Sequence, residues 1–270
     1  MRISLVQVAY GDDEPVEERR ARVADLVRAQ RGADLVVLPE LWAPGGFAYP
    51  EWAQRAEPVD GPTVQAVAAA ARDIGALLHA GSIVERAADG ADRGEQRRGL
   101  WNTSVLLGRD GGVLATYRKI HRFGFGVGEP RLLEAGSDVV VVPLPGLGDD
   151  AVAGLSTCYD LRFPELYRAQ LDAGARLFVL PAAWPATRVE HWSLLARARA
   201  VENQALVVAV NTAGTHAGTA MGGRSVVVGP RGEVLAEAGA DDEEVLVVDV
   251  DLADVAKARE AFPVLADRRL

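Results

Sequence analysis

The stretch Ala151-Val-Ala-Gly-Leu-Ser-Thr-Cys158-Tyr-Asp-Leu-Arg-Phe-Pro-Glu165 joins an apolar run to a polar segment. The first half is typical of a buried strand, and a helix is expected to follow, so Cys158 lies at a strand-to-helix junction. Backbone N–H groups at such a junction are free to hold an anion, and the helix N-terminus favours a thiolate. Cys158, the one cysteine of the chain, is therefore a candidate nucleophile if a base and an oxyanion stabiliser exist elsewhere.

Two further apolar runs end in a charged residue. Glu40 closes Asp34-Leu-Val-Val-Leu-Pro-Glu40, and Lys119 closes Val113-Leu-Ala-Thr-Tyr-Arg-Lys119. Taken singly, each residue also fits an ordinary role: the cysteine as a small buried hydrophobe, the glutamate as a strand terminator and the lysine as a surface charge. Together they supply a nucleophile, a candidate base and a candidate oxyanion stabiliser.

The bulk properties limit the classes of protein to consider. The 270 residues are 49% hydrophobic and contain no linker-like segment, so a single domain over residues 1–270 is expected. A net charge of −9 argues against a nucleic-acid or anionic-membrane partner. The four histidines form no i, i+4 pair, and none is interpreted as a metal ligand.

The same properties predict a cytoplasmic protein. A single cysteine excludes an internal disulfide. The start, Met1-Arg-Ile-Ser-Leu-Val-Gln-Val-Ala-Tyr10, is typical of a strand rather than a signal peptide. No apolar stretch approaches the ~18–20 residues of a membrane-spanning helix.

Short apolar runs alternate with helical segments along the chain. The runs are typical of strands covered on both faces; they are Ile3–Val8, Leu35–Leu38, Leu77–Val84, Thr103–Leu107, Val139–Val142, Val152–Leu155, Leu177–Leu180, Leu206–Val210, Ser225–Val228 and Val245–Val250. The predicted helices are Glu14–Gln30, Thr63–Ile74, Phe163–Leu171 and His191–Asn203. Hairpin turns are expected at 109–112 and 229–232, and the polar segment Glu85–Arg98 is expected to be an exposed loop. This mixture predicts a layered α/β protein with mixed sheets.

Several blocks of this sequence resemble the nitrilase superfamily of carbon–nitrogen hydrolases over nearly the whole chain. The blocks are Leu38-Pro-Glu-Leu-Trp42, Glu57-Pro-Val-Asp-Gly-Pro62, Gly81-Ser-Ile83, Asn102-Thr-Ser104, Tyr117-Arg-Lys-Ile-His-Arg-Phe123, Ser156-Thr-Cys-Tyr-Asp-Leu-Arg-Phe-Pro-Glu165, Arg197-Ala-Arg-Ala-Val-Glu-Asn203 and the segment 223–235. The resemblance implies a four-layer α-β-β-α sandwich. It also implies a homodimer or larger homo-oligomer, for which the helices from Glu165 and His191 and the terminal segment 253–270 are the candidate contacts.

The resemblance also implies a role for each residue of the triad. Cys158 attacks the carbonyl carbon, and Glu40 takes the thiol proton and later gives it to the departing nitrogen. Lys119 and the backbone N–H of Tyr159 stabilise the oxyanion. No metal or organic cofactor is required by this chemistry.

Relatives in the superfamily carry a second glutamate after the lysine. Glu129 and Glu134 are the two candidates in this chain. Glu134 lies in a segment expected to form a turn at the surface, so Glu129 is preferred as the supporting catalytic residue.

The residues after the nucleophile resemble the ω-amidase branch and its deaminated-glutathione-amidase relatives. This implies hydrolysis of a small primary amide that bears a carboxylate. Arg162 and Trp184 are candidate substrate-binding residues, although Arg162 and Glu165 also fit an internal ion pair that holds the nucleophile turn. Alternative functions are hydrolysis of a carbamoyl amide or a nitrile, acyl transfer to an amine, and a non-catalytic role.

Overall fold

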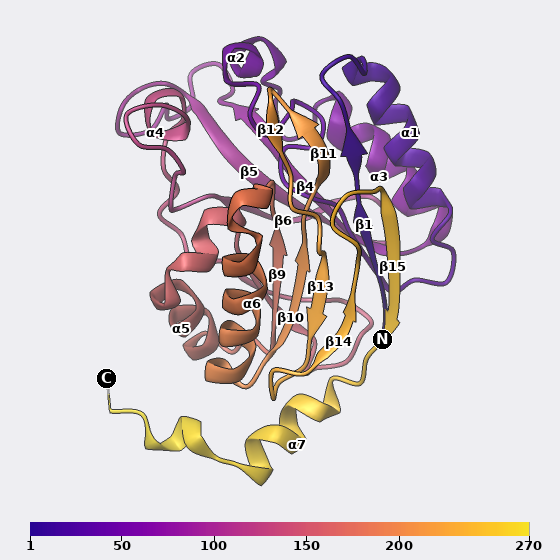
Figure 1. Ribbon diagram of the computed structural model, residues 1–270, viewed down its shortest axis with the longest axis vertical. Coiled ribbons are helices and arrows are strands. Elements are labelled where there is room, and N and C mark those ends of the chain that lie inside the picture. Colours follow the sequence, from indigo (N-terminus) through magenta and orange to yellow (C-terminus); the bar gives the residue numbers. More distant parts are fainter. Residues whose placement is uncertain (270) are drawn as a thin grey trace.

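Two six-stranded sheets packed face to face form the centre of the molecule (Figure 1). The computed structural model describes residues 1–269; Leu270, the last residue of the expected domain and terminal segment, lies outside the described residues. Helices cover the outer face of each sheet, so the layers follow the order α-β-β-α. This confirms the predicted four-layer sandwich with mixed sheets.

The first sheet has the strand order β15-β1-β3-β4-β5-β6. Its strands, in that order, are Glu244–Asp249, Arg2–Gln7, Leu35–Val37, Leu77–Arg86, Leu100–Leu107 and Val113–Arg118. The second sheet has the order β14-β13-β10-β9-β8-β7. Its strands are Val234–Glu237, Val226–Val228, Leu206–Val210, Leu177–Pro181, Val152–Leu155 and Val141–Pro143. A small third sheet joins β12 (Thr219–Ala220), β11 (Ala213–His216) and β2 (Ala9–Tyr10).

The helices divide between the two outer layers. Those of the first sheet are α1 (Val16–Arg28) and α3 (Pro62–Ile74), and those of the second are α5 (Pro164–Asp172) and α6 (Val189–Asn203). The remaining helices are α2 (Trp52–Arg55), α4 (Glu129–Leu132) and α7 (Ala253–Ala261), with 3-10 turns at Tyr49–Glu51, Cys158–Arg162, Ala186–Arg188 and Val264–Asp267. All four predicted helices are present, with ends within three residues of the expectation.

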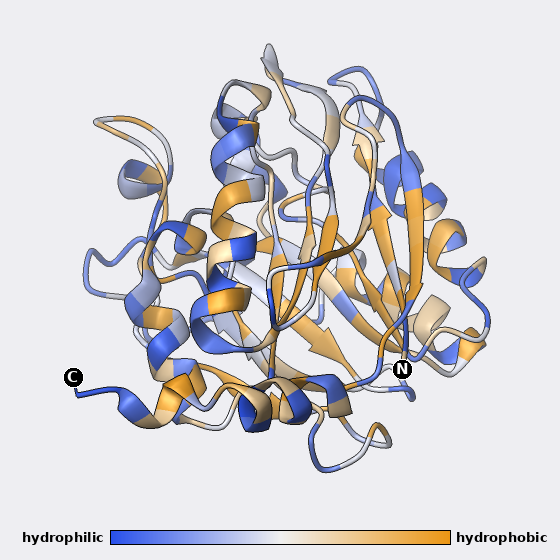
Figure 2. Cartoon of the chain, turned by 60° about the horizontal axis from the view of Figure 1, so that its bottom comes forward, coloured by the Kyte–Doolittle hydropathy of each residue, from blue (hydrophilic) through white to orange (hydrophobic). Residues whose placement is uncertain are grey.

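The alternation of side chains along each strand builds two separate cores. Leu35 and Val37 of β3 face the second sheet, whereas Val36 between them packs against α1 and α3. Parallel pairing brings Leu5 of β1 level with Val37, and both belong to the core between the sheets. Because successive residues of a strand point to opposite faces, an apolar run such as 35–38 can serve both layers. Figure 2 shows these apolar strands enclosed by helices with hydrophilic outer faces.

Strand directions bring several chain segments to one edge of the sandwich. β3 and β4 are parallel, and β6 runs the same way because it pairs antiparallel with β5, which pairs antiparallel with β4. β8 and β9 of the second sheet are likewise parallel. The hairpins predicted at 109–112 and 229–232 connect β5 to β6 and β13 to β14. The segments that follow β3 and β6 therefore leave the first sheet at the same edge.

The prediction that residues 85–98 form an exposed loop is wrong at its first residues. Strand β4 continues to Arg86, which pairs with Leu100 of β5. Glu85 is buried, accepts a 2.6 Å hydrogen bond from Thr103 Oγ1 and pairs with Arg118. In this extended part of the ladder, the Glu85 carboxylate has one partner on β5 and another on β6, the next strand of the sheet.

The terminal segment runs across one end of the sandwich and contacts its own chain. Arg268 forms a 2.6 Å ion pair with Asp172 at the end of α5. Gln204 Nε2 donates a 2.8 Å hydrogen bond to the Phe262 carbonyl. Within residues 1–269, the helices are too short or too polar to cross a membrane.

We expect Leu5→Ala to lower the free energy of unfolding by about 2–5 kcal/mol, because a fully buried side chain between the sheets would leave a cavity. Val247→Ala on the adjacent strand β15 is the matched control, since Val247 is 52% exposed and should lose less than about 0.5 kcal/mol. Urea unfolding followed by tryptophan fluorescence measures both. Equal losses for the two variants would contradict the assigned layers.

Candidate active site

Glu40, Lys119, Glu129 and Cys158 converge at the edge where β3, β6 and β8 end. Glu40 comes three residues after β3, Lys119 directly follows β6, and Cys158 comes three residues after β8. Glu129 is the first residue of α4. All four residues are at least nine-tenths buried. The structure thus brings together the four residues that the sequence predicted for the site.

The Glu40 carboxylate is held by three donors from different segments. Its Oε1 accepts hydrogen bonds from Asn102 Nδ2 at 2.8 Å and Lys119 Nζ at 2.7 Å. Its Oε2 accepts one from the Ala183 backbone N–H at 2.8 Å. The carboxylate is therefore fixed between the lysine and the segment that follows β9.

Lys119 lies between two carboxylates. Its Nζ is 2.7 Å from Glu40 Oε1 and 3.0 Å from Glu129 Oε2. Burial alone would lower the pKa of Lys119, but Glu129 and Glu40 raise it well above its usual value. The lysine is therefore a permanent cation in this site.

Glu129 completes the buried cluster. Its carboxylate accepts hydrogen bonds from Asn102 Nδ2 at 2.7 Å and from the Phe123 backbone N–H. Burial raises the pKa of Glu129, while Lys119 opposes that effect. One amide group, on Asn102, thus bridges both carboxylates from the start of β5.

Cys158 begins a 3-10 turn rather than the helix α5. Its φ of 48° lies in the left-handed region, which residues with side chains rarely adopt. The turn is closed by Asp160 Oδ2, which accepts a 2.9 Å hydrogen bond from the Thr157 N–H. The following helix starts only at Pro164, where a missing N–H has no cost.

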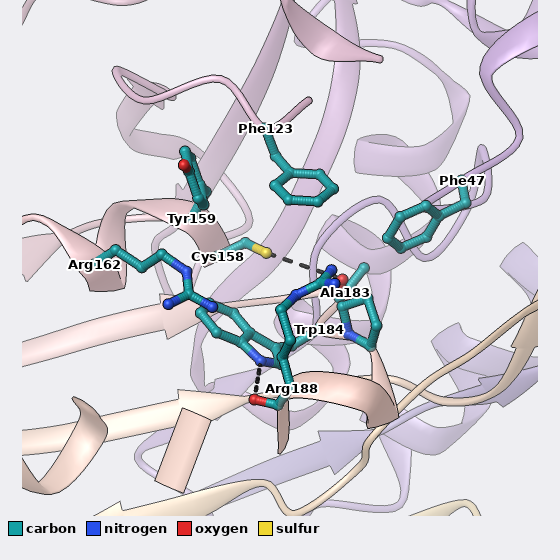
Figure 3. A pocket seen from close by; sticks show the side chains of 9 residues that line it. Phe47, Phe123, Cys158, Tyr159, Arg162, Ala183, Trp184 and Arg188 are labelled. Atoms are coloured by element: carbon teal, nitrogen blue, oxygen red, sulfur yellow. Dashed lines mark hydrogen bonds between the residues drawn. The ribbon is translucent and has the colours of Figure 1, made fainter. Parts of the chain in front are cut away.

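The Cys158 side chain rests as a thiol. Burial raises the pKa of the Cys158 thiol well above its ordinary value, the neighbouring Glu40 carboxylate raises it further, and Lys119 opposes both effects. Sγ lies 3.9 Å from the Ala183 carbonyl oxygen (Figure 3). The prediction that a helix N-terminus favours a thiolate here is wrong, because the thiol is buried beside a carboxylate and α5 begins six residues later.

Asp160 connects the 3-10 turn at Cys158 to the residues around Lys119, at and just after the end of β6. It is fully buried and accepts a 2.8 Å hydrogen bond from Tyr117 Oη and a 3.0 Å bond from the His121 backbone N–H. His121 Nδ1 is 2.7 Å from the same carboxylate. These partners lie two residues before and two residues after Lys119, so one side chain positions both the lysine and Cys158.

Two small hollows meet at Cys158. The inner one is lined by Glu40, Lys119, Glu129 and the rings of Tyr49 and Trp52. The other, called the outer hollow, is shown in Figure 3; its lining residues are Phe47, Phe123, Cys158, Tyr159, Arg162, Ala183, Trp184, Pro185 and Arg188. Each encloses about 240 Å³ of space between atoms.

Arg162 and Trp184 both line the outer hollow, in agreement with their predicted place at the site. The Arg162 guanidinium carbon lies 4.7 Å from the Trp184 ring centre, and Nη2 is 3.3 Å from His191 Nδ1. The alternative of an ion pair with Glu165 is wrong: these two residues form none in this structure, and Glu165 is exposed on α5. The guanidinium turns toward Trp184 instead.

Glu134 is not at the surface, as the sequence suggested, but almost fully buried. Its carboxylate accepts backbone hydrogen bonds of 2.9 Å from Gln96 and 2.7 Å from Arg98. It holds the 94–98 segment and takes no part in the cluster around Lys119. Among residues 1–269, no group of three or more His, Cys, Asp and Glu side chains is arranged to hold a metal ion.

Three site residues were missed by sequence reasoning. Asn102 belongs to the block Asn102-Thr-Ser104, and an amide side chain at the start of an apolar run is a usable signal. Asp160 lies two residues after the cysteine, and the preference of aspartate for capping positions is a usable signal. Arg188 follows an irregular Trp-Pro segment, and nothing in its sequence context marks it as a pocket residue.

Comparison with known proteins agrees with this geometry. The family model described as "Carbon-nitrogen hydrolase" matches residues 2–260. A 2-oxoglutaramate amidase of Paenarthrobacter nicotinovorans is 44% identical over 99% of this chain and 89% of its own length. A human omega-amidase is 34% identical over 99% of this chain and 95% of its own length.

A solved structure of a mutant amidase from Nesterenkonia sp. AN1 has a TM-score of 0.78 and 30% identity, and the match covers 99% of this chain and 97% of that one. That protein shows covalent addition of the acetamide moiety of fluoroacetamide at its active-site cysteine. With a matching family model over almost all its residues, the present chain is a hydrolase of carbon–nitrogen bonds that belongs to the nitrilase superfamily and, within it, to the omega-amidase branch.

Proposed function

We propose that this enzyme hydrolyses a small primary amide that carries a carboxylate, through a thioester on Cys158. The observation that carries the proposal is the position of the thiol, between the buried Glu40–Lys119–Glu129 cluster and a pocket wall with arginines and no acidic residue. The names of the relatives support 2-oxoglutaramate as the compound to test first. Both 2-oxoglutaramate and a simpler amide with a carboxylate at its far end, such as glutaramate, carry the negative charge that this arginine-containing wall would attract.

Acylation begins when the thiol gives up its proton. Glu40 takes the proton from Cys158 Sγ as sulfur attacks the amide carbon, and the carbonyl π electrons move to oxygen. The tetrahedral species collapses, the carbon–nitrogen bond breaks, and the nitrogen leaves as ammonia with the proton that Glu40 returns. The raised pKa of Cys158 makes this base necessary, since the resting thiol is not ionised.

Deacylation uses the same carboxylate. Glu40 takes a proton from water as its oxygen attacks the thioester carbon, and the carbon–sulfur bond then breaks. The sulfur recovers a proton from Glu40, and the carboxylic acid product leaves as its anion after it loses a proton to solvent. The enzyme returns to its starting state.

Lys119 Nζ and the Tyr159 backbone N–H are the proposed oxyanion donors. Lys119 is held as a cation by Glu40 and Glu129, so its charge is in place before the reaction. Tyr159 is the second residue of the 3-10 turn, and its N–H has no hydrogen-bond partner among residues 1–269. Glu129 supports the reaction by positioning Lys119.

Arg162 and Trp184 are the proposed substrate-binding residues. Trp184 is an almost fully buried wall of the outer hollow, and the Arg162 guanidinium lies against its ring. A guanidinium fixed on an aromatic face presents its donors to a carboxylate in a defined direction. This arrangement supports a substrate with an acid group at the end remote from the amide.

We further propose a homodimer or larger homo-oligomer that acts in the cytoplasm as one catalytic domain over residues 1–270. Leu194 and Val201 on α6 are 66% and 50% exposed, and Phe262 after α7 is 67% exposed. Apolar side chains of this size on one face support contact between copies. The lone cysteine supports a reducing compartment, and the charge of −9 supports small-molecule chemistry without a nucleic-acid or membrane partner.

A substrate panel tests the proposed reaction. We expect ammonia release from 2-oxoglutaramate, deaminated glutathione and glutaramate, with little from an N-carbamoyl amino acid or an aliphatic nitrile. Turnover of only the last two would contradict the proposed substrate class while keeping the nucleophile. Added hydroxylamine distinguishes transfer to an amine from hydrolysis by the product formed.

Cys158→Ala should abolish ammonia release from every substrate in the panel, because no other thiol exists to form the thioester. The substitution removes little volume, so thermal unfolding of the variant should resemble that of the wild type. Activity assays and circular dichroism are the two measurements. Turnover that persists in a folded variant is incompatible with the mechanism.

Glu40→Gln should slow both acylation and deacylation by at least about 10²-fold, since an amide cannot accept the thiol or water proton. Rapid-quench mass spectrometry measures the thioester on Cys158 and its decay. Glu18→Gln, an exposed residue of α1, is the control with the same charge change. Formation of the thioester at the wild-type rate would disprove the single-base account.

A further inference from the structure

Arg188 lines the same hollow as Cys158, and within residues 1–269 its side chain has no polar partner. It ends the 3-10 turn Ala186–Arg188, whose backbone is tied to the pocket by a 2.7 Å hydrogen bond from Trp184 Nε1 to the Arg188 carbonyl. In the described part of the chain, its guanidinium donates no hydrogen bond and has no carboxylate within 4.0 Å. The backbone is therefore fixed while all five side-chain N–H groups remain available.

This situation contrasts with other half-buried arginines of the protein. Arg22 and Arg118 each pair with a glutamate, at 2.7 Å and 2.6 Å. Arg162, on the opposite side of Trp184 in Figure 3, is held by the tryptophan ring and His191. The Arg188 guanidinium lies near an aromatic ring instead, with its carbon 5.4 Å from the Phe123 ring centre.

The charge of the hollow is opposite to that of the molecule. The chain has a net charge of −9, yet the wall of the outer hollow contains two arginines and no aspartate or glutamate. The remaining lining is mainly aromatic and apolar. Such walls strengthen the attraction between a cation and an incoming anion because they keep water away from one side.

We infer that Arg188 is a specificity-determining residue that binds the carboxylate of the substrate and sets the preference for anionic over neutral acyl chains. This inference rests on the proposed function, because it assigns the group that recognises the acid end of the same substrate. Arg162 supplies a second cation from the other side of Trp184. The two guanidinium groups together accommodate a carboxylate with a neighbouring oxygen acceptor, such as a 2-oxo acid.

The test compares two amides with the same carbon chain, glutaramate, which ends in a carboxylate, and pentanamide, which ends in a methyl group. We expect Arg188→Met to lower the ratio of kcat/KM for glutaramate to that for pentanamide by at least about tenfold, mainly through a higher KM for glutaramate. This is the range expected from the loss of a charge-assisted hydrogen bond. Methionine keeps an unbranched apolar side chain against Phe123.

Two further variants separate charge recognition from structure. Arg188→Lys keeps the positive charge but lacks the planar guanidinium group. Its ratio of kcat/KM for glutaramate to that for pentanamide should lie between those of the wild type and Arg188→Met. Arg31→Met makes the same charge change at an exposed position before the start of β3, and its ratio should equal that of the wild type. Glutarate, a carboxylate competitor, should inhibit the wild type at least about tenfold more strongly than the Arg188→Met variant.

The outcomes distinguish this inference from the proposed function. A wild-type preference for glutaramate that survives Arg188→Met, or an equal loss on both amides, overturns the role of Arg188 alone. A wild-type enzyme that shows no preference for glutaramate over pentanamide overturns the proposed substrate class. A lower ratio in Arg188→Met, with recovery in Arg188→Lys, supports both.

Discussion

The buried ammonium of Lys119 is the constraint on which the site depends. A charge without water needs partners of opposite sign, and Glu40 and Glu129 supply them at 2.7 Å and 3.0 Å. Loss of either carboxylate would leave the lysine under-compensated, and changes of this kind in proteins typically cost about 3–5 kcal/mol. The fold must therefore bring the segments after β3 and β6 and the start of α4 to one point, and the shared edge of the first sheet does this.

A third buried carboxylate, that of Asp160, joins the two sheets at the same place. Asp160 belongs to the nucleophile turn after β8 of the second sheet, while Tyr117 and His121 flank Lys119 at the end of β6 in the first. Its hydrogen bond to the Thr157 N–H also holds the turn that gives Cys158 its left-handed backbone. One buried side chain thus links the turn that carries Cys158 to the residues on both sides of Lys119.

The sequence predicts the parts of this enzyme that depend on local pattern. Apolar runs with a charged residue at the end correctly located Glu40 and Lys119 after strands, and all four predicted helices are present. The sequence predictions are wrong where burial in the folded protein determines the surroundings of a side chain. Glu134 is buried because two backbone N–H groups of the 96–98 segment bind its carboxylate, and no pattern around Glu134 reveals a partner so far away in the chain.

The protonation state of Cys158 is a second property that the local sequence does not predict. The local sequence predicts that Cys158 lies at a helix N-terminus, where the thiolate form is favoured. In the folded protein, burial and the Glu40 carboxylate raise the pKa of Cys158, and Lys119 does not reverse that effect because two carboxylates already share its charge. The proposed mechanism therefore starts from the protonated thiol, which loses its proton to Glu40 as sulfur attacks the substrate carbonyl carbon. In the proposed mechanism, proton transfer accompanies bond formation, and the Glu40 carboxylate acts as base and acid in both halves of the reaction.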